Sequence, residues 1–199
     1  MPTAKKVLVA CEYSGTVRDA FTKAGHHAVS CDLLPSETGT GQQAGLFGGP
    51  LYHYQGSVLD ILDDGWDLMV AFPPCTHLCV SGARWFKDKA EEQADALEFV
   101  RTLLNADIPQ IALENPVGVI STQIRKPSQY VQPWQFGHGE TKKTGLWLKN
   151  LPLLTPTNVV SGRADRIHKM APSPDRWRER SRTYQGIADA MAAQWGDHQ

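Results

Sequence analysis

The first half of the chain alternates short apolar runs with segments of helical periodicity. Apolar runs typical of buried strands occupy residues 6–10, 27–30, 67–72 and 111–113. Apolar positions at helical spacing predict helices over residues 16–24 and 87–105. This alternation predicts a Rossmann-like α/β fold, with a mostly parallel sheet and helices on both of its faces.

Beyond Pro116 the pattern weakens, because prolines repeatedly interrupt it. Residues 145–148 predict one more strand, and residues 186–195 predict a closing helix. The glycine-rich residues 35–50 predict a long loop. A length of 199 residues suits a single domain. We divide it into a cofactor and catalytic core (1–116) and a basic, substrate-facing part with the closing helix (117–199).

Charge is distributed unevenly along the chain. Residues 1–116 hold 8 Lys and Arg against 15 Asp and Glu, whereas residues 117–199 hold 12 against 6, which together give the net charge of −1. Cations gather between residues 163 and 182, and the same half carries Trp134, Trp147 and Trp177. This combination is typical of a surface on which bases stack beside phosphate-binding cations, and also of an ordinary solvated face.

The composition is that of a folded protein outside the membrane. Hydrophobic residues make up 41% and charged residues 21%, and no run approaches the roughly 20 apolar residues that a bilayer requires. The first residues have no apolar signal-peptide core. Four cysteines are too few for a disulfide scaffold. We therefore expect free thiols, no membrane partner and a cytoplasmic location, which would be the host cytoplasm if the chain is viral.

Polar and reactive residues follow the predicted strands. Glu12, Asp32, Cys75 and Glu114 each come at or just after the end of an apolar run. Ligands of open parallel sheets bind at the carboxyl ends of the strands, so these four side chains are expected to converge on one crevice. Cys75, His77 and Cys79 lack the second ligand cluster of a structural zinc site, so we expect no metal.

Two of these strand ends carry the motifs Phe72-Pro73-Pro74-Cys75 and Glu114-Asn115-Pro116. Their order and spacing resemble the DNA cytosine-5 methyltransferase family, whose catalytic pair is the Cys of a Pro-Cys motif and the Glu of a Glu-Asn-Val motif. Further segments are similar to its first motif (7–21), its Gln-x-Arg-x-Arg region (136–148) and its closing helix (182–195). Only residues 152–181 stand where family members usually carry a separate target-recognition domain.

The resemblance implies a covalent mechanism. Cys75 would add to C6 of a flipped-out cytosine, Glu114 would protonate N3, and Lys142 would contact the base. The nucleophile must be a thiolate, which an electropositive setting or a helix beginning after Gly82 would favour. The base that removes the C5 proton stays open, and a water molecule is one candidate. The residues expected to contact the substrate are Pro74, Ser81, Arg84, Asn115 and Lys143.

The resemblance also implies S-adenosylmethionine as cofactor. The family's Phe-x-Gly-x-Gly-Gly motif aligns with residues 10–15 and keeps one glycine of three, so Glu12 would either obstruct the cofactor or replace a contact. Asp32 matches the acidic residue that binds ribose hydroxyls, whereas Ser57 stands where the family often has an Asp. The residues expected to bind the cofactor are Glu12, Tyr13, Ser14, Gly15, Asp32, Leu33 and Pro73.

Three functions therefore stay open. The first is methyl transfer to cytosine in DNA, with a short or relaxed sequence preference because so little chain is available for target recognition. The second keeps Cys75 and Glu114 but modifies C5 without S-adenosylmethionine, by hydroxylation or transfer of another one-carbon unit, on DNA or on a nucleotide. The third is an inactive nucleic-acid-binding module. The sequence leaves the target site and the oligomeric state undecided.

Overall fold

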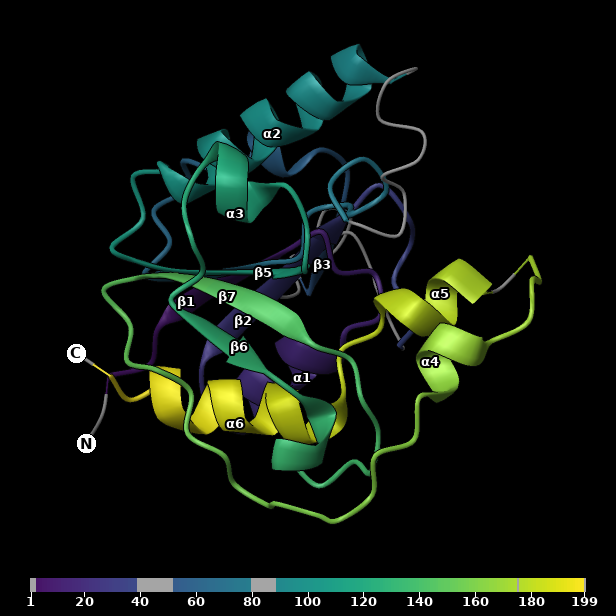
Figure 1. The fold of residues 1–199 in the computed structure, drawn as a ribbon. Coiled ribbons are helices and arrows are strands. Elements are labelled where there is room, and N and C mark those ends of the chain that lie inside the picture. Colours follow the sequence, from purple (N-terminus) through teal and green to yellow (C-terminus); the bar gives the residue numbers. More distant parts are fainter. Residues whose placement is uncertain (1–2, 39–51, 80–88, 175, 199) are drawn as a thin grey trace.

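The computed structural model describes residues 3–38, 52–79, 89–174 and 176–198. Its centre is a seven-stranded sheet of order β3-β2-β1-β4-β5-β7-β6 (Figure 1). The strands are β1 (Lys6–Ala10), β2 (His27–Asp32), β3 (His53–Gln55), β4 (Leu68–Ala71), β5 (Gln110–Pro116), β6 (Gln129–Val131) and β7 (Thr144–Lys149). The first five run parallel, and β7 pairs antiparallel with both β5 and β6.

Helices cover both faces of this sheet. On one face α1 (Thr16–Lys23) packs with α6 (Gln185–Trp195), and Phe21, Met191 and Trp195 are buried against Val7 and Val9 of β1. On the other face lie α2 (Ala90–Leu104) and α3 (Ile120–Gln123), as Figure 1 shows. Apolar residues alternate between these two cores along each central strand, which is why the runs are continuous in the sequence. The predicted α/β fold class is confirmed.

Two short helices form an arm beside the carboxyl ends of the parallel strands. They are α4 (Arg166–Lys169) and α5 (Arg176–Ser181), and both lie apart from the helices that cover the sheet (Figure 1). Two single 3-10 turns, Val58–Asp60 and Pro133–Gln135, complete the described elements. None of these helical elements in the described chain spans a bilayer, since no helix there is both long and apolar enough.

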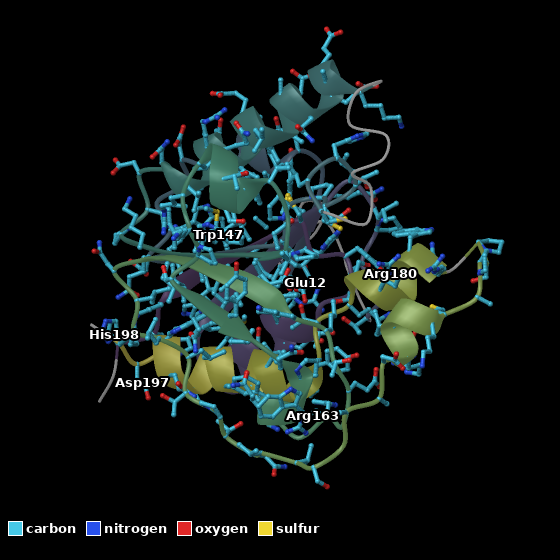
Figure 2. All side chains as sticks on the ribbon, in the orientation of Figure 1. Glu12, Trp147, Arg163, Arg180, Asp197 and His198 are labelled. Carbon is cyan, nitrogen blue, oxygen red and sulfur yellow. The ribbon has the colours of Figure 1, made fainter. Side chains whose placement is uncertain are left out.

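The structure changes three details of the sequence prediction. β5 continues through Glu114, Asn115 and Pro116, which were expected beyond the strand, because these residues pair with β7. Strands β3 and β6 are additional; each has three residues and lacks a distinct apolar run. Trp147 is only 1% exposed, and its indole Nε1 donates to the Arg125 carbonyl oxygen (Figure 2). Trp147 is therefore a core residue and does not belong to a base-stacking surface.

Candidate active site

The Pro-Pro-Cys segment forms a tight turn after β4. Proline cannot donate to a sheet ladder, so β4 ends at Ala71 and the chain turns at Pro73. The carbonyl oxygen of Cys75 accepts the backbone N–H groups of Leu78 and Cys79, both at 3.0 Å. This single helical turn places the Cys75 thiol beside the end of the neighbouring strand β5.

Asn115 of β5 holds this turn in place. Its side chain is 1% exposed, and its Nδ2 donates to the Pro73 carbonyl oxygen at 2.8 Å. Asn115 was expected to contact the substrate; its Nδ2 is bonded to the turn, whereas its buried Oδ1 has no hydrogen-bond partner among the described residues. The geometry makes it a positioning residue for the segment that carries Cys75.

A second contact joins the same turn to the chain that follows β5. Cys79 pairs with Gly118, and the Val119 N–H donates to the Leu78 carbonyl oxygen at 2.8 Å. A Cβ atom at position 118 would lie 1.9 Å from that oxygen, so only glycine allows so close an approach. The turn is thus fixed to β5 on both sides of Cys75.

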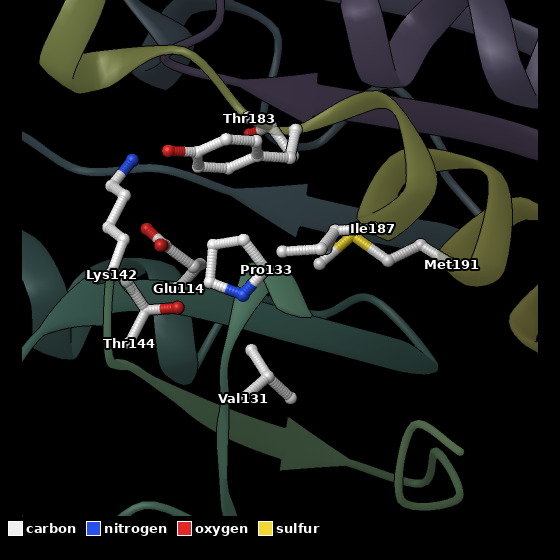
Figure 3. A pocket seen from close by; sticks show the side chains of 9 residues that line it. Glu114, Val131, Pro133, Lys142, Thr144, Thr183, Ile187 and Met191 are labelled. Atoms are coloured by element: carbon white, nitrogen blue, oxygen red, sulfur yellow. The ribbon is translucent and has the colours of Figure 1, made fainter. Parts of the chain in front are cut away.

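Glu114 projects from β5 into a small cavity that it shares with Lys142. In Figure 3 Glu114 extends from β5 and Lys142 from the segment just before β7 toward the same space. The centre of a water molecule can occupy only ≈ 10 Å³ of this cavity, room for about one water. Its lining consists of Glu114, Val131, Pro133, Lys142, Thr144, Thr183, Tyr184, Ile187 and Met191. A cytosine ring therefore requires the wall of the cavity to move.

The electrostatics link Cys75 to this cavity. A hydrogen bond with the Cys79 thiol, burial and the nearby Glu114 carboxylate all raise the pKa of Cys75, and Lys142 lowers it. Burial also raises the pKa of Glu114, while Lys142 and a hydrogen bond with Thr144 lower it. The structure thus brings Cys75, Glu114 and Lys142 together. The expected electropositive setting of the thiol is reduced to Lys142, and burial together with Cys79 outweighs it.

Lys142 and Lys143 have different surroundings. The Lys142 Nζ donates to the Arg182 carbonyl oxygen at 3.2 Å, while Lys143 lies 4.3 Å above the Tyr130 ring on the outside of β6. Pro74 is exposed on the turn before Cys75. Ser81 and Arg84, expected to contact the substrate, lie outside the described residues, as does the helix expected after Gly82.

The candidate cofactor crevice lies where β1 and β2 end. After β1 the backbone turns at Cys11, whose φ is 59°, and the Glu12 N–H donates to the Cys31 carbonyl oxygen at 3.0 Å. Asp32 accepts the Leu34 N–H at 2.9 Å, and burial raises the pKa of its carboxyl group. Leu33 is 74% exposed. Asp32 and Leu33 therefore present a carboxylate and an apolar side chain at the end of the sheet.

The Glu12 side chain is bonded within the protein, at the start of α1. Its carboxylate accepts the N–H groups of Val17 at 2.7 Å and Arg18 at 3.2 Å, and the hydroxyl of Ser14 at 3.2 Å (Figure 2 labels Glu12). The first N–H groups of a helix have no partner inside it, and the N-cap Gly15 has no side chain to supply one. Glu12 thus caps α1, and these hydrogen bonds occupy both of its carboxylate oxygens.

Burial dominates the titration of Glu12. It raises the pKa of Glu12 to about 7, although the hydrogen bonds from Val17, Arg18 and Ser14 and the charge of Arg18 lower it. Ser14 is itself buried with Glu12. Gly15 has a φ of 76°, and a Cβ atom there would meet Thr38 Oγ1 at 2.2 Å. The retained glycine of the first motif is therefore required by packing within the protein.

Tyr184, which the sequence analysis did not single out, connects the Glu114 cavity to a neighbouring cluster of side chains. The Tyr184 ring lines the cavity, and the Tyr184 hydroxyl donates to Glu140 at 2.7 Å. Glu140 also forms an ion pair with Arg166 of α4 at 3.2 Å, and His138 lies against the Tyr184 ring. Glu140 occupies the first position of the Gln-x-Arg-x-Arg region, which was the signal for it. Nothing in the local sequence indicates that Arg166 and Tyr184 meet there.

Comparison with known proteins identifies the architecture. The sequence matches no protein-family model and no curated protein. Among solved structures, the methyltransferase EhMeth of Entamoeba histolytica matches with a TM-score of 0.50 at 15% identity, covering 79% of this chain and 58% of that one. A DNMT2 mutant of Spodoptera frugiperda gives 0.46 at 13% identity, covering 81% and 54%. The Dnmt2 methyltransferase of S. pombe gives 0.45 at 14%, covering 85% and 55%.

The chain thus spans between half and two thirds of the length of these three structures. At 15% identity the similarity to the E. histolytica enzyme concerns the fold. The seven-stranded, mostly parallel sheet with helices on both faces is a methyltransferase-like α/β fold.

Proposed function

We propose that the chain is a cytosine C5-modifying enzyme that acts on DNA and uses S-adenosylmethionine as methyl donor. The observation that carries this proposal is the convergence of Cys75, Glu114 and Lys142 beside the adjacent strands β4, β5 and β7 of a methyltransferase-like fold. Each side chain alone has ordinary explanations. A thiol, a buried carboxyl group and a cation in one place supply what addition to a pyrimidine requires.

Glu114 acts as the acid in this proposal. Burial favours its neutral form, and a protonated carboxyl group can give its proton to N3 of cytosine. Protonation at N3 withdraws electrons from C6, so a thiolate adds there more readily. Lys142, which lines the same cavity, keeps a positive charge near the developing anionic groups.

Cys75 acts as the nucleophile. Its thiol loses a proton, the sulfur bonds to C6, and C5 becomes an enamine carbon that can attack an electrophile. After C5 is substituted, a base removes the C5 proton and the sulfur leaves, which regenerates the thiolate. Asn115 holds Pro73 during this cycle and so fixes the position of the sulfur relative to Glu114.

The crevice at Asp32 is the proposed cofactor site. One Asp32 oxygen accepts the Leu34 N–H, and a carboxylate held in this way suits the hydroxyl pair of a ribose. Leu33 offers apolar contact, and Tyr13, Gly15 and Pro73 border the same strand ends. S-adenosylmethionine, when bound, supplies an electrophilic methyl group. Glu12 contributes by ordering α1 rather than by touching the ligand.

A specific observation favours the second candidate, modification with a different donor. The Glu12 carboxylate occupies the N-terminus of α1, where glycines of the first motif would leave the backbone free.

One experiment tests both candidates. Purified protein is incubated with DNA and labelled S-adenosylmethionine, and the nucleosides are analysed by mass spectrometry. We expect 5-methylcytosine with the wild type and none with Cys75→Ser. Another product mass would favour the second candidate, and methylation that survives Cys75→Ser would refute the proposal.

A further inference from the structure

Helix α5 is short and is not packed into either hydrophobic core of the protein. It is six residues long, and none of its residues is buried. So short a helix is not stable in isolation, and burial of an apolar face is what usually holds a helix in place. Contacts from other parts of the chain must therefore keep it where it is.

Those contacts go mainly to the backbone and the C-terminal end of α5. The Tyr13 hydroxyl donates to the Arg178 carbonyl oxygen and pairs with the Ser181 hydroxyl, both at 3.1 Å. Glu37 forms an ion pair of 2.7 Å with Arg182, whose carbonyl oxygen accepts the Lys142 Nζ. The helix is thus held between the candidate cofactor crevice and the Glu114 cavity.

Within the described part of the chain, these contacts leave the arginine side chains of α5 without an ion-pair partner. Residues 176–182 contain four arginines and one glutamate. Arg182 pairs with Glu37, but no described carboxylate forms an ion pair with Arg176, Arg178 or Arg180. The Arg176 Nε is buried and has no hydrogen-bond partner within the described part of the chain.

An exposed aromatic side chain accompanies these cations. Trp177 is 48% exposed, and the Arg178 guanidinium lies 5.3 Å from the centre of its ring. The Trp177 ring also contacts the Tyr13 ring, with 5.7 Å between ring centres and a tilted arrangement. Figure 2 shows Arg180 on α5, at the side of the molecule where the arm lies. Free guanidinium groups beside an aromatic ring suit a chain of phosphates that carries bases.

The position of α5 connects this surface to the candidate active site. Two residues after Arg182 the chain reaches Tyr184, which lines the Glu114 cavity together with Thr183. A strand whose phosphates lie on α5 would therefore pass directly beside that cavity. Residues 1–116 carry a net negative charge, so the attraction for a polyanion comes from the C-terminal half, to which α5 belongs.

We propose that α5 is the phosphate-binding element for the nucleic acid that carries the target base, with Arg176, Arg178 and Arg180 as its cations and Trp177 as an aromatic platform. The proposal rests on the proposed function for the choice of DNA over other polyanions. In this proposal α5 supplies a substrate contact for which the DNA cytosine-5 methyltransferases that the sequence resembles use a separate target-recognition domain.

The test is binding of the full chain to a fluorescent DNA duplex at several salt concentrations, without any methyl donor. Each lost phosphate contact lowers the slope of log K against log salt by about 0.9. We expect the double substitution Arg178→Ala and Arg180→Ala to weaken binding and to lower this slope by about 2. The matched control, Lys23→Ala with Arg101→Ala, removes two cations from α1 and α2 and should leave the slope unchanged.

The conservative pair Arg178→Lys and Arg180→Lys should keep most of the slope, which separates loss of charge from loss of folding. An RNA duplex of the same sequence shows which nucleic acid binds more tightly through α5. A slope unaffected by the alanine pair would overturn the proposal, as would tight binding to phosphatidylserine vesicles without binding to DNA. Because no donor is present, such a failure would leave methyl transfer through Cys75 untouched, and the reverse also holds.

Discussion

Replacing Glu12 by Gln tests how the first turn of α1 is organised. The native state holds the pKa of this carboxyl group at about 7, against a usual value of 4.5. Between these values the folded protein binds a proton that the unfolded chain does not. The free energy of unfolding is therefore highest below pH 4.5, where Glu12 is neutral in both states, and it falls as the pH rises through 7. The difference between the two pKa values, at about 1.4 kcal/mol for each pKa unit, corresponds to a loss of about 3 kcal/mol in the free energy of unfolding. Most of this loss occurs between pH 5 and pH 8.

The assay is urea unfolding of wild type and Glu12→Gln from pH 5 to pH 8, followed by tryptophan fluorescence. Gln keeps one oxygen for the α1 N–H groups but has no charge to desolvate, so its free energy of unfolding should lack this dependence. We expect the wild type to lose about 2 to 3 kcal/mol relative to the variant across that range. Glu91→Gln, an exposed acid in the first turn of α2, serves as control and should parallel the wild type. Parallel curves for wild type and Glu12→Gln would refute the buried, helix-capping role.

Two further substitutions test the candidate active site. Asn115→Ala removes the donor to the Pro73 carbonyl oxygen, which should cost about 1 to 3 kcal/mol in the free energy of unfolding. Because Asn115 positions Cys75, kcat for methyl transfer should fall while KM for the donor changes little; an unchanged kcat would contradict that role. Lys142→Met removes the cation that lowers the pKa of Cys75. The rise in single-turnover rate with pH should then move upward by about 1 pH unit or more, whereas the exposed Lys126→Met should leave the profile in place. A pH profile unchanged by Lys142→Met would show that this lysine does not affect the ionisation of the Cys75 thiol.

The sequence predicted the parts of the fold that depend on local pattern. Residues 7–10 and 68–71 are apolar because both of their faces are buried, and that pattern can be recognised without a structure. β3 and β6 were missed because each is three residues long and is held by a neighbouring strand rather than by its own composition. The extent of β5 depends likewise on β7, which lies about thirty residues further along the chain.

The candidate site was predictable where a motif carries it. Cys75 and Glu114 follow from their motifs, and the structure places them together. The role of Glu12 did not follow, because its partners become visible only when α1 is built onto β1. The contact between Arg166, Glu140 and Tyr184 joins residues up to 44 positions apart, and only the folded chain brings them together. Trp147 shows the converse error, since its basic neighbours in the sequence did not place it at the surface.

The central claim is a bond between the Cys75 sulfur and C6 of cytosine. DNA whose cytosines carry fluorine at C5 tests it directly, because fluorine cannot leave as the C5 proton does and the adduct persists. Mass spectrometry of wild-type protein incubated with this DNA and S-adenosylmethionine should show one added strand, and peptide mapping should locate it at Cys75. Protein without an adduct, or an adduct that persists in Cys75→Ser, would contradict the account.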